Sequence, residues 1–484
     1  MTTPLTPVES KDASFGVKLY LGTSMAVLLL MMLVGGLMRA AQAGWLDIPA
    51  DVFYQLMTAH GAGMVGIAGL AGAGIMWHFL GRYVQLSAAV LYINYGLFLA
   101  GVVLILGAIF WGGYAGGWTF LWPLPAKSMG LWSAHAAASF IVGLLLIGVG
   151  FLIFNLDAGL AITRQYGSVL RGLGMDQLWS GQIQANHPPA VVASSMVIIV
   201  NTLGILSGAV VLAVTLANLY FPELVINPLL AKNLIYFFGH VFINATIYMS
   251  VIAVYELLPV YAGRPWKVSR PFYAAWAAAT VFVMAVYPHH LLLDSVMPAP
   301  LLVLGQIVSY LSGIPVLLVT VYGALLLVYR SGIQWKVPAL WLMLAMFGWA
   351  AGVIPAIVDG TIHVNKVMHN TMWVPGHFHF YLLLGVLPMV IGFGLHITSL
   401  HKALNEPLQR AFFFLYFAGA SAFSVAFLAG GWASVPRRWA QHWPEWMAYD
   451  QAGSLAALVV IVAMLGLVIA LIKRLLERHH GTTA

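Results

Sequence analysis

The segment WVPGHFHFYLLLGV, residues 373–386, places His377 and His379 two positions apart at the start of an apolar run. Residues i and i+2 of an α-helix are separated by about 200°, so the two side chains point to opposite sides. Two such rings cannot bind one metal ion, but they can bind two centres that flank the helix. Because neutral imidazole is an ordinary ligand of haem iron, copper, iron and zinc, the spacing predicts metal or haem chemistry.

Four further histidines lie inside or at the rim of long apolar segments: His60, His240, His289 and His290. A lone buried histidine is usually a neutral core residue that is hydrogen-bonded to a backbone carbonyl. Counting along the segments at about 1.5 Å per residue, however, places all six histidines in the outer part of the bilayer, those with a countable depth roughly 9 to 12 Å below its surface. Because the ligands of one centre must meet at one height, this common depth predicts shared metal sites.

Helical spacing indicates which of these histidines act together. His60, on another helix, can supply the second axial ligand opposite His379, which gives a six-coordinate haem suited to electron transfer. A haem held only by His377 keeps an open position for a small molecule. Across that position lies a three-histidine set for a separate metal ion: His240, His289 and His290.

The segments that carry these histidines belong to a chain of 484 residues, of which 62% are hydrophobic and 7% are charged. This composition excludes an ordinary soluble protein and predicts an all-α polytopic membrane protein, with residues 1–484 forming one membrane-embedded catalytic domain. Twelve apolar stretches of about 20 residues or more are expected to cross the membrane. They are 18–39, 52–80, 84–112, 131–156, 190–220, 232–262, 271–290, 299–329, 337–358, 371–400, 409–431 and 450–474.

The charge distribution predicts how these spans are oriented. The polar start of the chain lacks the basic region and cleavage site of a signal peptide, so 18–39 is expected to be a retained first span. An even number of spans places both termini on one side, and most of the 21 Lys and Arg fall in segments on that side. Both termini are therefore expected in the cytoplasm, with the protein in the cell membrane and its histidines nearer the outer face. The longest inner loop, 157–189, is expected to be one polar surface excursion.

The chain has no cysteine, which limits the cofactors that it can hold itself. It cannot carry a covalently attached c-type haem, an iron-sulfur cluster or a cysteine-ligated copper. Electrons are therefore expected from a partner, either a subunit with a cupredoxin or cytochrome c centre, or quinol from the membrane lipid. The net charge of +7 is spread over the loops, which is typical of membrane topology and not of nucleic-acid binding.

Six motifs along the chain resemble subunit I of the haem-copper oxidoreductases, the superfamily of terminal oxidases and nitric oxide reductases. They are TAHGAGM around His60, GGWTFLWPLPA at 116–126, GHVFIN at 239–244, YPHHLLLD at 287–294, HNTMWVPGHFHF at 369–380 and SVPRRWA at 434–440. The motifs follow one another from the second helix to the last, and the HH pair together with GHFH is highly specific. The resemblance implies a twelve-helix core with both termini inside, in agreement with the hydropathy count.

The resemblance also implies two haems and one copper ion. His60 and His379 would hold the low-spin haem, and His377 the high-spin haem. The copper ligands would be His240, His289 and His290. The haem propionates would be held by an arginine pair, whose forked guanidinium groups suit carboxylates, and by a nearby histidine. These residues are Arg437, Arg438 and His369.

The sequence departs from this family at Asn244, four residues after His240. Many oxygen-reducing members have a tyrosine at that position, and another branch supplies it from the position that Val283 occupies here. Because residues i and i+4 share a helix face, Asn244 should point at the active site, where an amide can hydrogen-bond a ligand but cannot be oxidised. Tyr236 and Tyr287 lie near the site in sequence, but neither is at a recognised position.

Nitric oxide reductases of this superfamily need no such tyrosine, because joining two NO molecules breaks no O–O bond. Their familiar members have a glutamate at this position and bind non-haem iron, whereas three neutral imidazoles without a carboxylate suit copper at least as well. We therefore favour copper, with non-haem iron as the alternative, and reduction of a small gas, NO to N2O. An O2-reducing cytochrome c or quinol oxidase is the alternative function. A twelve-helix transporter is disfavoured, because the spans contain almost no acidic residues.

Proton supply is expected from the inner side. Tyr255 resembles a channel entry of one oxidase branch, and Glu256 is the acidic candidate for uptake, although it also fits an interfacial residue. Hydroxyl groups between the inner side and the histidines belong to Thr246, Tyr248, Ser250, Ser309, Ser312 and Thr320. Because such hydroxyls are also common backbone-bonded filler, the pattern does not predict proton pumping.

The other histidines lie at helix ends, in loops or in the tail, and seven of them are expected to be solvated: His78, His187, His396, His401, His442, His479 and His480. For His135 and His363, the sequence does not indicate whether the side chain is solvated or buried.

Overall fold

The computed structural model describes residues 14–184, 187–294 and 296–477. Within them, twelve helical segments are long and apolar enough to cross a membrane, which confirms the predicted number. They are α1 (Phe15–Gln42), α2 (Ala50–Leu80), α3 (Ala88–Phe110), α4 (Ala134–Tyr166), α7 (Pro189–Tyr220), α8 (Pro228–Ala262), α9 with η1 (Arg270–Leu291), α10 to α12 (Ala299–Val328), α13 (Val337–Asp359), α15 to α16 (Trp373–Ser399), α17 (Glu406–Trp432) and η4 with α18 (Pro444–Leu476).

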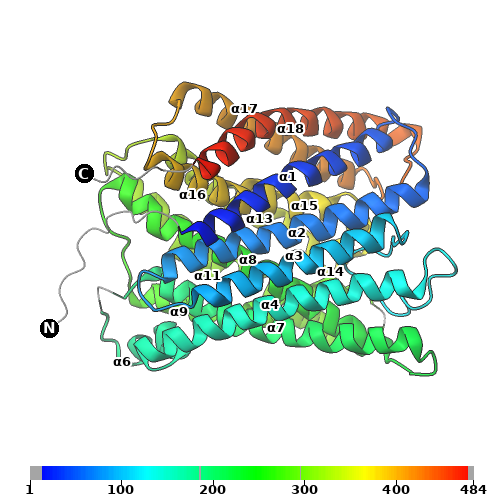
Figure 1. The fold of residues 1–484 in the computed structure, drawn as a ribbon, viewed down its shortest axis with the longest axis horizontal. Helices are drawn as coiled ribbons and strands as arrows, with labels where there is room; N and C mark the ends of the chain where they lie inside the picture. Colours follow the sequence, from blue (N-terminus) through cyan, green and yellow to red (C-terminus); the bar gives the residue numbers. More distant parts are fainter. Residues whose placement is uncertain (1–13, 185–186, 295, 478–484) are drawn as a thin grey trace.

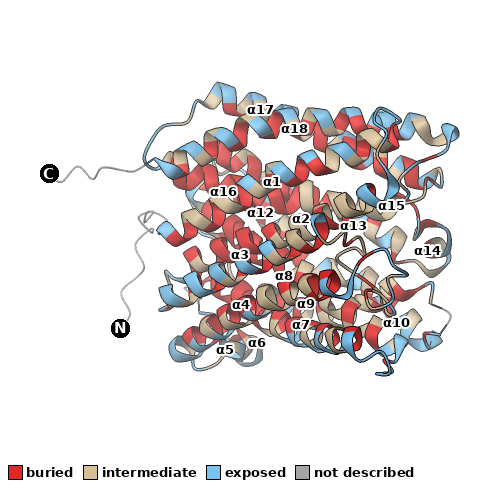
Figure 2. Cartoon of the chain, turned by 45° about the vertical axis from the view of Figure 1, so that its right-hand side comes forward, coloured by how far each residue is buried: buried red, intermediate tan, exposed pale blue. Residues whose placement is uncertain are grey.

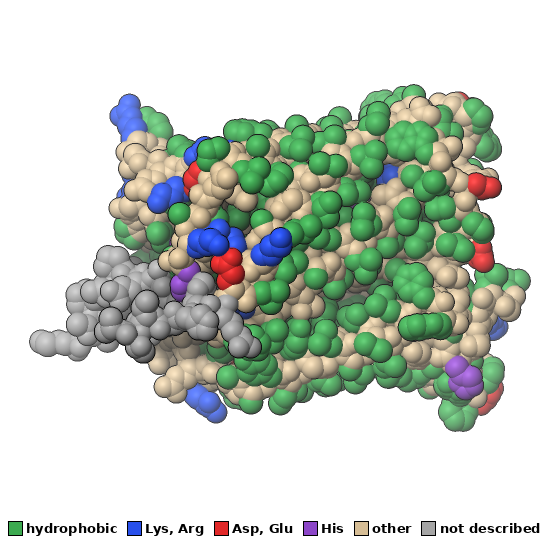
Figure 3. Space-filling view, turned by 45° about the horizontal axis from the view of Figure 1, so that its top comes forward, with side chains coloured by type: hydrophobic (Ala, Val, Ile, Leu, Met, Phe, Trp, Pro, Cys, Tyr) green, Lys and Arg blue, Asp and Glu red, His purple; other side chains and the backbone are tan. Residues whose placement is uncertain are grey.

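The spans lie side by side along the long axis of the molecule (Figure 1). Four pairs of consecutive spans pack closely, α1 with α2, α3 with α4, α7 with α8 and α17 with α18, and α1 packs against α18, so the first and last spans are adjacent. The start of α1 and the end of α18 lie at the same end of the bundle (Figure 1). On the face shown in Figure 3, apolar side chains cover the middle and most Lys and Arg gather at that end. This pattern is the one expected of a protein surrounded by lipid.

Burial identifies the central helices. In the most apolar stretch of α8, and likewise of the span 373–399, 83% of residues are buried, against 22% in the span 299–328. Buried segments run through the middle of the bundle, and exposed ones lie on its outer edges and ends (Figure 2). The helices that carry His240, His377 and His379 are therefore those most enclosed by protein, as a site that excludes lipid and water requires.

The loop expected at 157–189 is largely helical, so that expectation was wrong. α4 continues ten residues beyond its predicted end, to Tyr166, and stops at Gly167, whose φ of 86° is the left-handed conformation that glycine adopts readily. Two short helices follow, α5 (Val169–Gly172) and α6 (Met175–Ser180). Hydropathy located only the lipid-spanning part of α4, because its last turns are polar.

The helices around the histidines are interrupted near the site. α9 (Arg270–Ala285) ends early, and the histidine pair lies on the 3-10 turn η1 (Tyr287–Leu291), because Pro288 has no backbone N–H and cannot continue an α-helix. α15 (Trp373–Tyr381) passes into α16 (Leu387–Ser399) through the π-helical turn η3 (Leu382–Val386). A second π-helical turn, η2 (Leu317–Val321), joins α10 (Ala299–Ser312) and α11 (Ile314–Val316) to α12 (Tyr322–Val328). Such turns occur frequently at functional sites.

Candidate metal and haem site

A cavity of about 620 Å³ lies inside the bundle and is lined by all six of the membrane histidines. It extends from α1 and α2 on one side to η1 and α10 on the other, and α15 crosses it. Its lining includes the arginine pair and Asn244 as well. The common depth predicted from sequence thus corresponds to one connected space.

On one side of α15, three histidines converge. His240 Nδ1 lies 3.0 Å from His290 Nε2, and His289 Nε2 lies 3.1 Å from the same atom. Ligand atoms of all three rings lie within 4.8 Å of one another. The second nitrogen of His289, Nδ1, contacts Ser309 Oγ at 2.6 Å. When that nitrogen carries the proton and donates to the hydroxyl, Nε2 is left as a lone pair directed at its neighbours, which is the state that a metal ligand needs.

Asn244 lies against this cluster, as its spacing from His240 predicts. Its Nδ2 is 3.0 Å from His240 Nε2 and donates to the His240 backbone oxygen at 2.9 Å. The ring of Tyr236 stacks on His290, with centroids 5.5 Å apart and an interplanar angle of 16°. Tyr287, in contrast, donates to Asn233 Oδ1 at 3.0 Å and does not line the cavity.

His377 and His379 face opposite sides of α15. His377 is close enough to His240 and His289 to interact with them electrostatically, and its ring contacts Tyr381 at 5.2 Å between centroids. His379 instead lies near His60. The structure therefore separates the histidines into two groups, one on each side of the helix.

Backbone carbonyls hold the rings of His60 and His379. His60 Nδ1 lies 2.7 Å from Met31 O, and His379 Nδ1 lies 2.6 Å from Pro375 O. A carbonyl oxygen only accepts hydrogen bonds, so each Nδ1 carries the proton and each Nε2 keeps its lone pair. Both residues line the cavity, and two such nitrogens suit the axial positions of one haem.

The arginine pair lies on a tight turn at the rim of the cavity. Arg437 N donates to Asn370 O at 2.9 Å, and Arg438 adopts a φ of 66°, in the left-handed region that non-glycine residues rarely occupy. Burial and the neighbouring Arg438 lower the pKa of Arg437 to about 10. Burial, with both arginines, lowers the pKa of His369 to about 4. The Asp359 carboxylate is close enough to Arg437 to interact with it electrostatically, but Arg437 Nε and His369 Nδ1 are buried without hydrogen-bond partners in the described residues, so both can still bind an anionic acceptor.

Four histidines expected to be solvated are buried. His78 contacts Arg82 at 3.1 Å, His187 Nε2 contacts Gly172 O at 2.9 Å, and His396 Nδ1 contacts Tyr261 Oη at 2.8 Å. The fourth, His442, bridges Asp450 and Pro436. Three of them have partners on other segments, which a position at a helix end does not reveal, and the partner of His78 lies four residues further along the chain. Of the others, His401 is exposed as expected, His135 and His363 are exposed too, and His479 and His480 lie outside the described residues.

Tyr255 is buried and the Glu256 side chain is largely enclosed, but they face different segments of the chain. Tyr255 Oη lies 2.5 Å from Thr320 Oγ1, on the turn η2. Glu256 accepts hydrogen bonds of 3.0 and 3.1 Å from Tyr83 Oη, and Arg82 lies 3.8 Å from its carboxylate. The Glu256 side chain is only 7% exposed and packs against these two residues.

Comparison with known proteins agrees with this geometry. The family model described as cytochrome c and quinol oxidase polypeptide I matches residues 16–479. The heme-copper oxidase subunit I+III of Aeropyrum pernix is 25% identical over 94% of this chain and 55% of its own length. A putative cytochrome c oxidase subunit 1-beta of Streptomyces avermitilis is 27% identical over 92% of this chain and 78% of its own.

A solved structure of a heme-copper terminal oxidase dimer shares the fold. Its TM-score is 0.77 at 20% identity, over 96% of this chain and 84% of that chain. The transporter alternative is set aside by these matches. With the family model covering nearly the whole sequence, the chain belongs to the subunit I family of the haem-copper oxidases.

Proposed function

We propose that this chain reduces nitric oxide to nitrous oxide at a site formed by a haem and a copper ion, with a second haem passing electrons to it. Two NO molecules, two electrons and two protons give one N2O and one water. One N–N bond forms and one N–O bond breaks, and the electrons come from a donor outside the chain. When bound, the haem and copper supply redox-active metals that can bind NO.

The residues around the cavity fit these groups. His60 and His379 would hold the low-spin haem, and His377 the high-spin haem. Arg437 and His369, whose buried nitrogens lack partners, would bind propionate carboxylates together with Arg438. The copper ligands would be His240, His289 and His290. Neutral imidazoles without a carboxylate within this cluster favour copper over non-haem iron.

Asn244 is the observation that carries the choice of gas. Its amide lies 3.0 Å from His240 Nε2, at the position from which oxygen-reducing relatives are expected to supply a tyrosine. The amide can orient the His240 ring and hydrogen-bond a ligand, but it cannot donate an electron. NO reduction needs no such electron from the protein, because no O–O bond is broken.

Oxygen reduction is the second candidate, and Tyr236 favours it. Its phenol ring stacks on His290, so an oxidisable group does touch the proposed copper cluster, although from another position. The relatives also carry oxidase names. In this alternative Tyr236 would supply the electron that Asn244 cannot.

The test compares the two gases. Purified complex with a reduced donor should consume NO and release N2O at an ordinary enzymatic rate, about 1–10³ s⁻¹, and should reduce O2 much more slowly. Asn244→Tyr, which removes the amide from His240 Nε2, should lower NO turnover by about tenfold or more, in the range found for groups that orient metal ligands. Rapid cyanide-sensitive O2 consumption that Tyr236→Phe abolishes, with negligible NO turnover, would establish the oxidase instead.

Protons would reach the site from the inner side along the spans 228–262 and 299–328. The bond between Tyr255 and Thr320 forms the inner part of this route, and Ser309, which contacts His289, forms its outer end. Ser312 lines the cavity between them. Because Glu256 faces the turn that follows α2, it would serve a separate uptake point.

The orientation and partners are part of the same proposal. Both ends of the chain would lie in the cytoplasm, since α1 begins and α18 ends at the end of the bundle that is rich in Lys and Arg (Figures 1 and 3). The rim arginines would then face outward. An outer subunit with a cupredoxin or cytochrome c centre, or quinol, would deliver electrons there, with residues 1–484 acting as one catalytic domain.

A glycine in α1 permits the approach of His60. A Cβ at Gly35 would lie 2.7 Å from His60 Cε1 and 3.0 Å from its Nδ1. Gly35→Ala is therefore expected to displace the ring from Met31 O and to weaken binding of the low-spin haem by about 10–100-fold. The measurement is the low-spin haem absorbance of purified protein.

Gly22→Ala is the matched control, because nothing lies within 4 Å of a Cβ at that position in the same helix. Equal spectra for the two variants would show that His60 does not hold a haem.

A further inference from the structure

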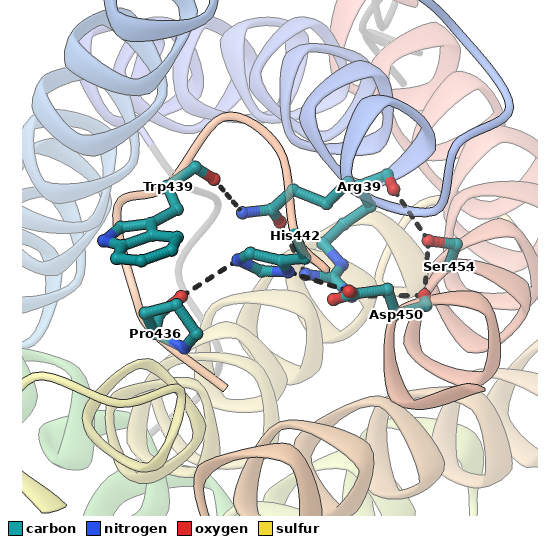
Figure 4. Close-up of polar contacts among 7 residues, drawn as sticks. Arg39, Pro436, Trp439, His442, Asp450 and Ser454 are labelled. Atoms are coloured by element: carbon teal, nitrogen blue, oxygen red, sulfur yellow. Dashed lines mark hydrogen bonds and ion pairs between the residues drawn. The ribbon is translucent and has the colours of Figure 1, made fainter. Parts of the chain in front are cut away.

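Three buried side chains are joined by hydrogen bonds and ion pairs (Figure 4), and one of them, Arg39, lines the cavity. Arg39 lies near the outer end of α1, Asp450 lies in α18 (Met447–Leu476), and His442 lies in the loop that precedes α18. The exposed side-chain fractions are 6% for Arg39, 2% for Asp450 and 0% for His442. We call these three residues the rim network. From the sequence, His442 was expected to be solvated.

The hydrogen bonds of the rim network fix its proton count. His442 Nε2 lies 3.0 Å from Pro436 O, and because a carbonyl only accepts, Nε2 carries a hydrogen. His442 Nδ1 lies 2.7 Å from Asp450 Oδ2, while Arg39 donates to Asp450 Oδ1 at 2.9 Å. A lone pair on Nδ1 facing an ionised oxygen at that distance would be repulsive, so one proton is shared between the two atoms.

The net charge follows from this count. If the shared proton lies on His442, the network contains two cations and one anion. If it lies on Asp450, Arg39 is the only charged member. Either distribution leaves one net positive charge, buried where the surrounding dielectric screens it little.

This charge lies close to the proposed low-spin haem. Arg39 lines the cavity, and its guanidinium lies 4.8 Å from the ring centroid of Phe427. That ring in turn contacts His379, with centroids 5.2 Å apart. At its other end the network holds Pro436, the residue before the arginine pair, through His442.

We propose that His442 is a positioning residue for the low-spin haem site. It fixes the turn that carries Arg437 and Arg438, and with Asp450 and Arg39 it maintains one positive charge that favours the reduced haem. The inference rests on the proposed function, because it requires a haem between His60 and His379.

Three substitutions separate charge from structure. His442→Gln keeps a hydrogen-bonding amide but removes the shared proton, so the network becomes neutral. Asp450→Asn lets a neutral His442 accept from the new amide while Arg39 stays charged, so the net charge remains +1. His442→Lys returns a cation to the network. His363→Gln, at an exposed histidine of α14 (Ile362–Met368), is the control.

The readout is a potentiometric titration of the low-spin haem absorbance in purified complex. His442→Gln should lower the midpoint potential so that the reduced-to-oxidised ratio at a fixed potential falls about tenfold, which is 59 mV for a one-electron couple. Asp450→Asn, His442→Lys and His363→Gln should stay near the parent value. If His442→Gln does not accumulate, His442→Asn removes the same charge with a shorter amide.

The outcomes distinguish this inference from the function on which it rests. An unchanged potential in His442→Gln with the haem still bound would overturn the inference alone. Equal decreases in His442→Gln and Asp450→Asn would overturn it too, because Asp450→Asn keeps both the net charge and the bond between His442 and Pro436. A parent protein without any low-spin haem would overturn the proposed function itself.

Discussion

Replacing His379 by alanine is expected to remove the low-spin haem and leave the high-spin haem in place, whereas His377→Ala should do the reverse. The two residues lie on one helix and face opposite sides of it, so each substitution empties one side. Turnover should fall at least about 100-fold in both variants, because losing a ligand costs more than losing a group that orients one. Visible spectra of the purified variants, oxidised and reduced, measure which haem remains.

Each variant is the matched control of the other, since both remove one cavity-lining imidazole from the same turn of α15. Identical spectra for the two variants, with either both haems lost or both retained, would contradict the assignment of His377 and His379 to separate centres.

The second large effect is expected at His290. Its Nε2 is the common neighbour of His240 Nδ1 and His289 Nε2, at 3.0 and 3.1 Å, so His290→Ala removes the central nitrogen of the cluster. Copper content should fall from one per chain to near zero, and turnover by at least about 100-fold. Both haem spectra should persist, because their ligands lie on other helices. Elemental analysis together with haem absorbance measures both quantities.

His363→Ala, at an exposed histidine on the same side as the arginine turn, controls for copper bound nonspecifically. Full copper content in His290→Ala would show that the three-histidine cluster does not hold the metal.

Much of this architecture follows from the sequence. Spans of about 20 apolar residues are set by bilayer thickness, so hydropathy alone identified all twelve. Counting residues along those spans placed six histidines at a similar depth in the membrane. The 200° separation of His377 and His379 placed their side chains on opposite sides of a helix. Both inferences use only the geometry of the α-helix. A membrane restricts the backbone to this conformation more strictly than water does.

The features that the sequence did not predict depend on contacts between distant segments. His442 follows Trp439 and Gln441 in a short loop, and its partner Asp450 matters only because α18 packs on α1. His396 and Tyr261 come from helices that are 135 residues apart in the chain. The π-helical turns after His379 and around Thr320 have no pattern in the sequence either.

The role of Asn244 combines an inference from helix spacing with an inference from chemistry. The i,i+4 spacing predicted that it faces the site, and the structure places its amide 3.0 Å from His240. Its consequence for substrate choice is chemical, because an amide cannot be oxidised. The stacking of Tyr236 on His290 could not be predicted from spacing along α8, since the ring of His290 belongs to another element.

Cofactor analysis of the purified complex tests the central claim most directly, that six histidines hold two haems and a copper ion. Haem extraction and elemental analysis should give two haems and one copper per chain, and the spectrum should show one low-spin and one high-spin haem. Protein that contains no haem, or one haem and no copper, would contradict it.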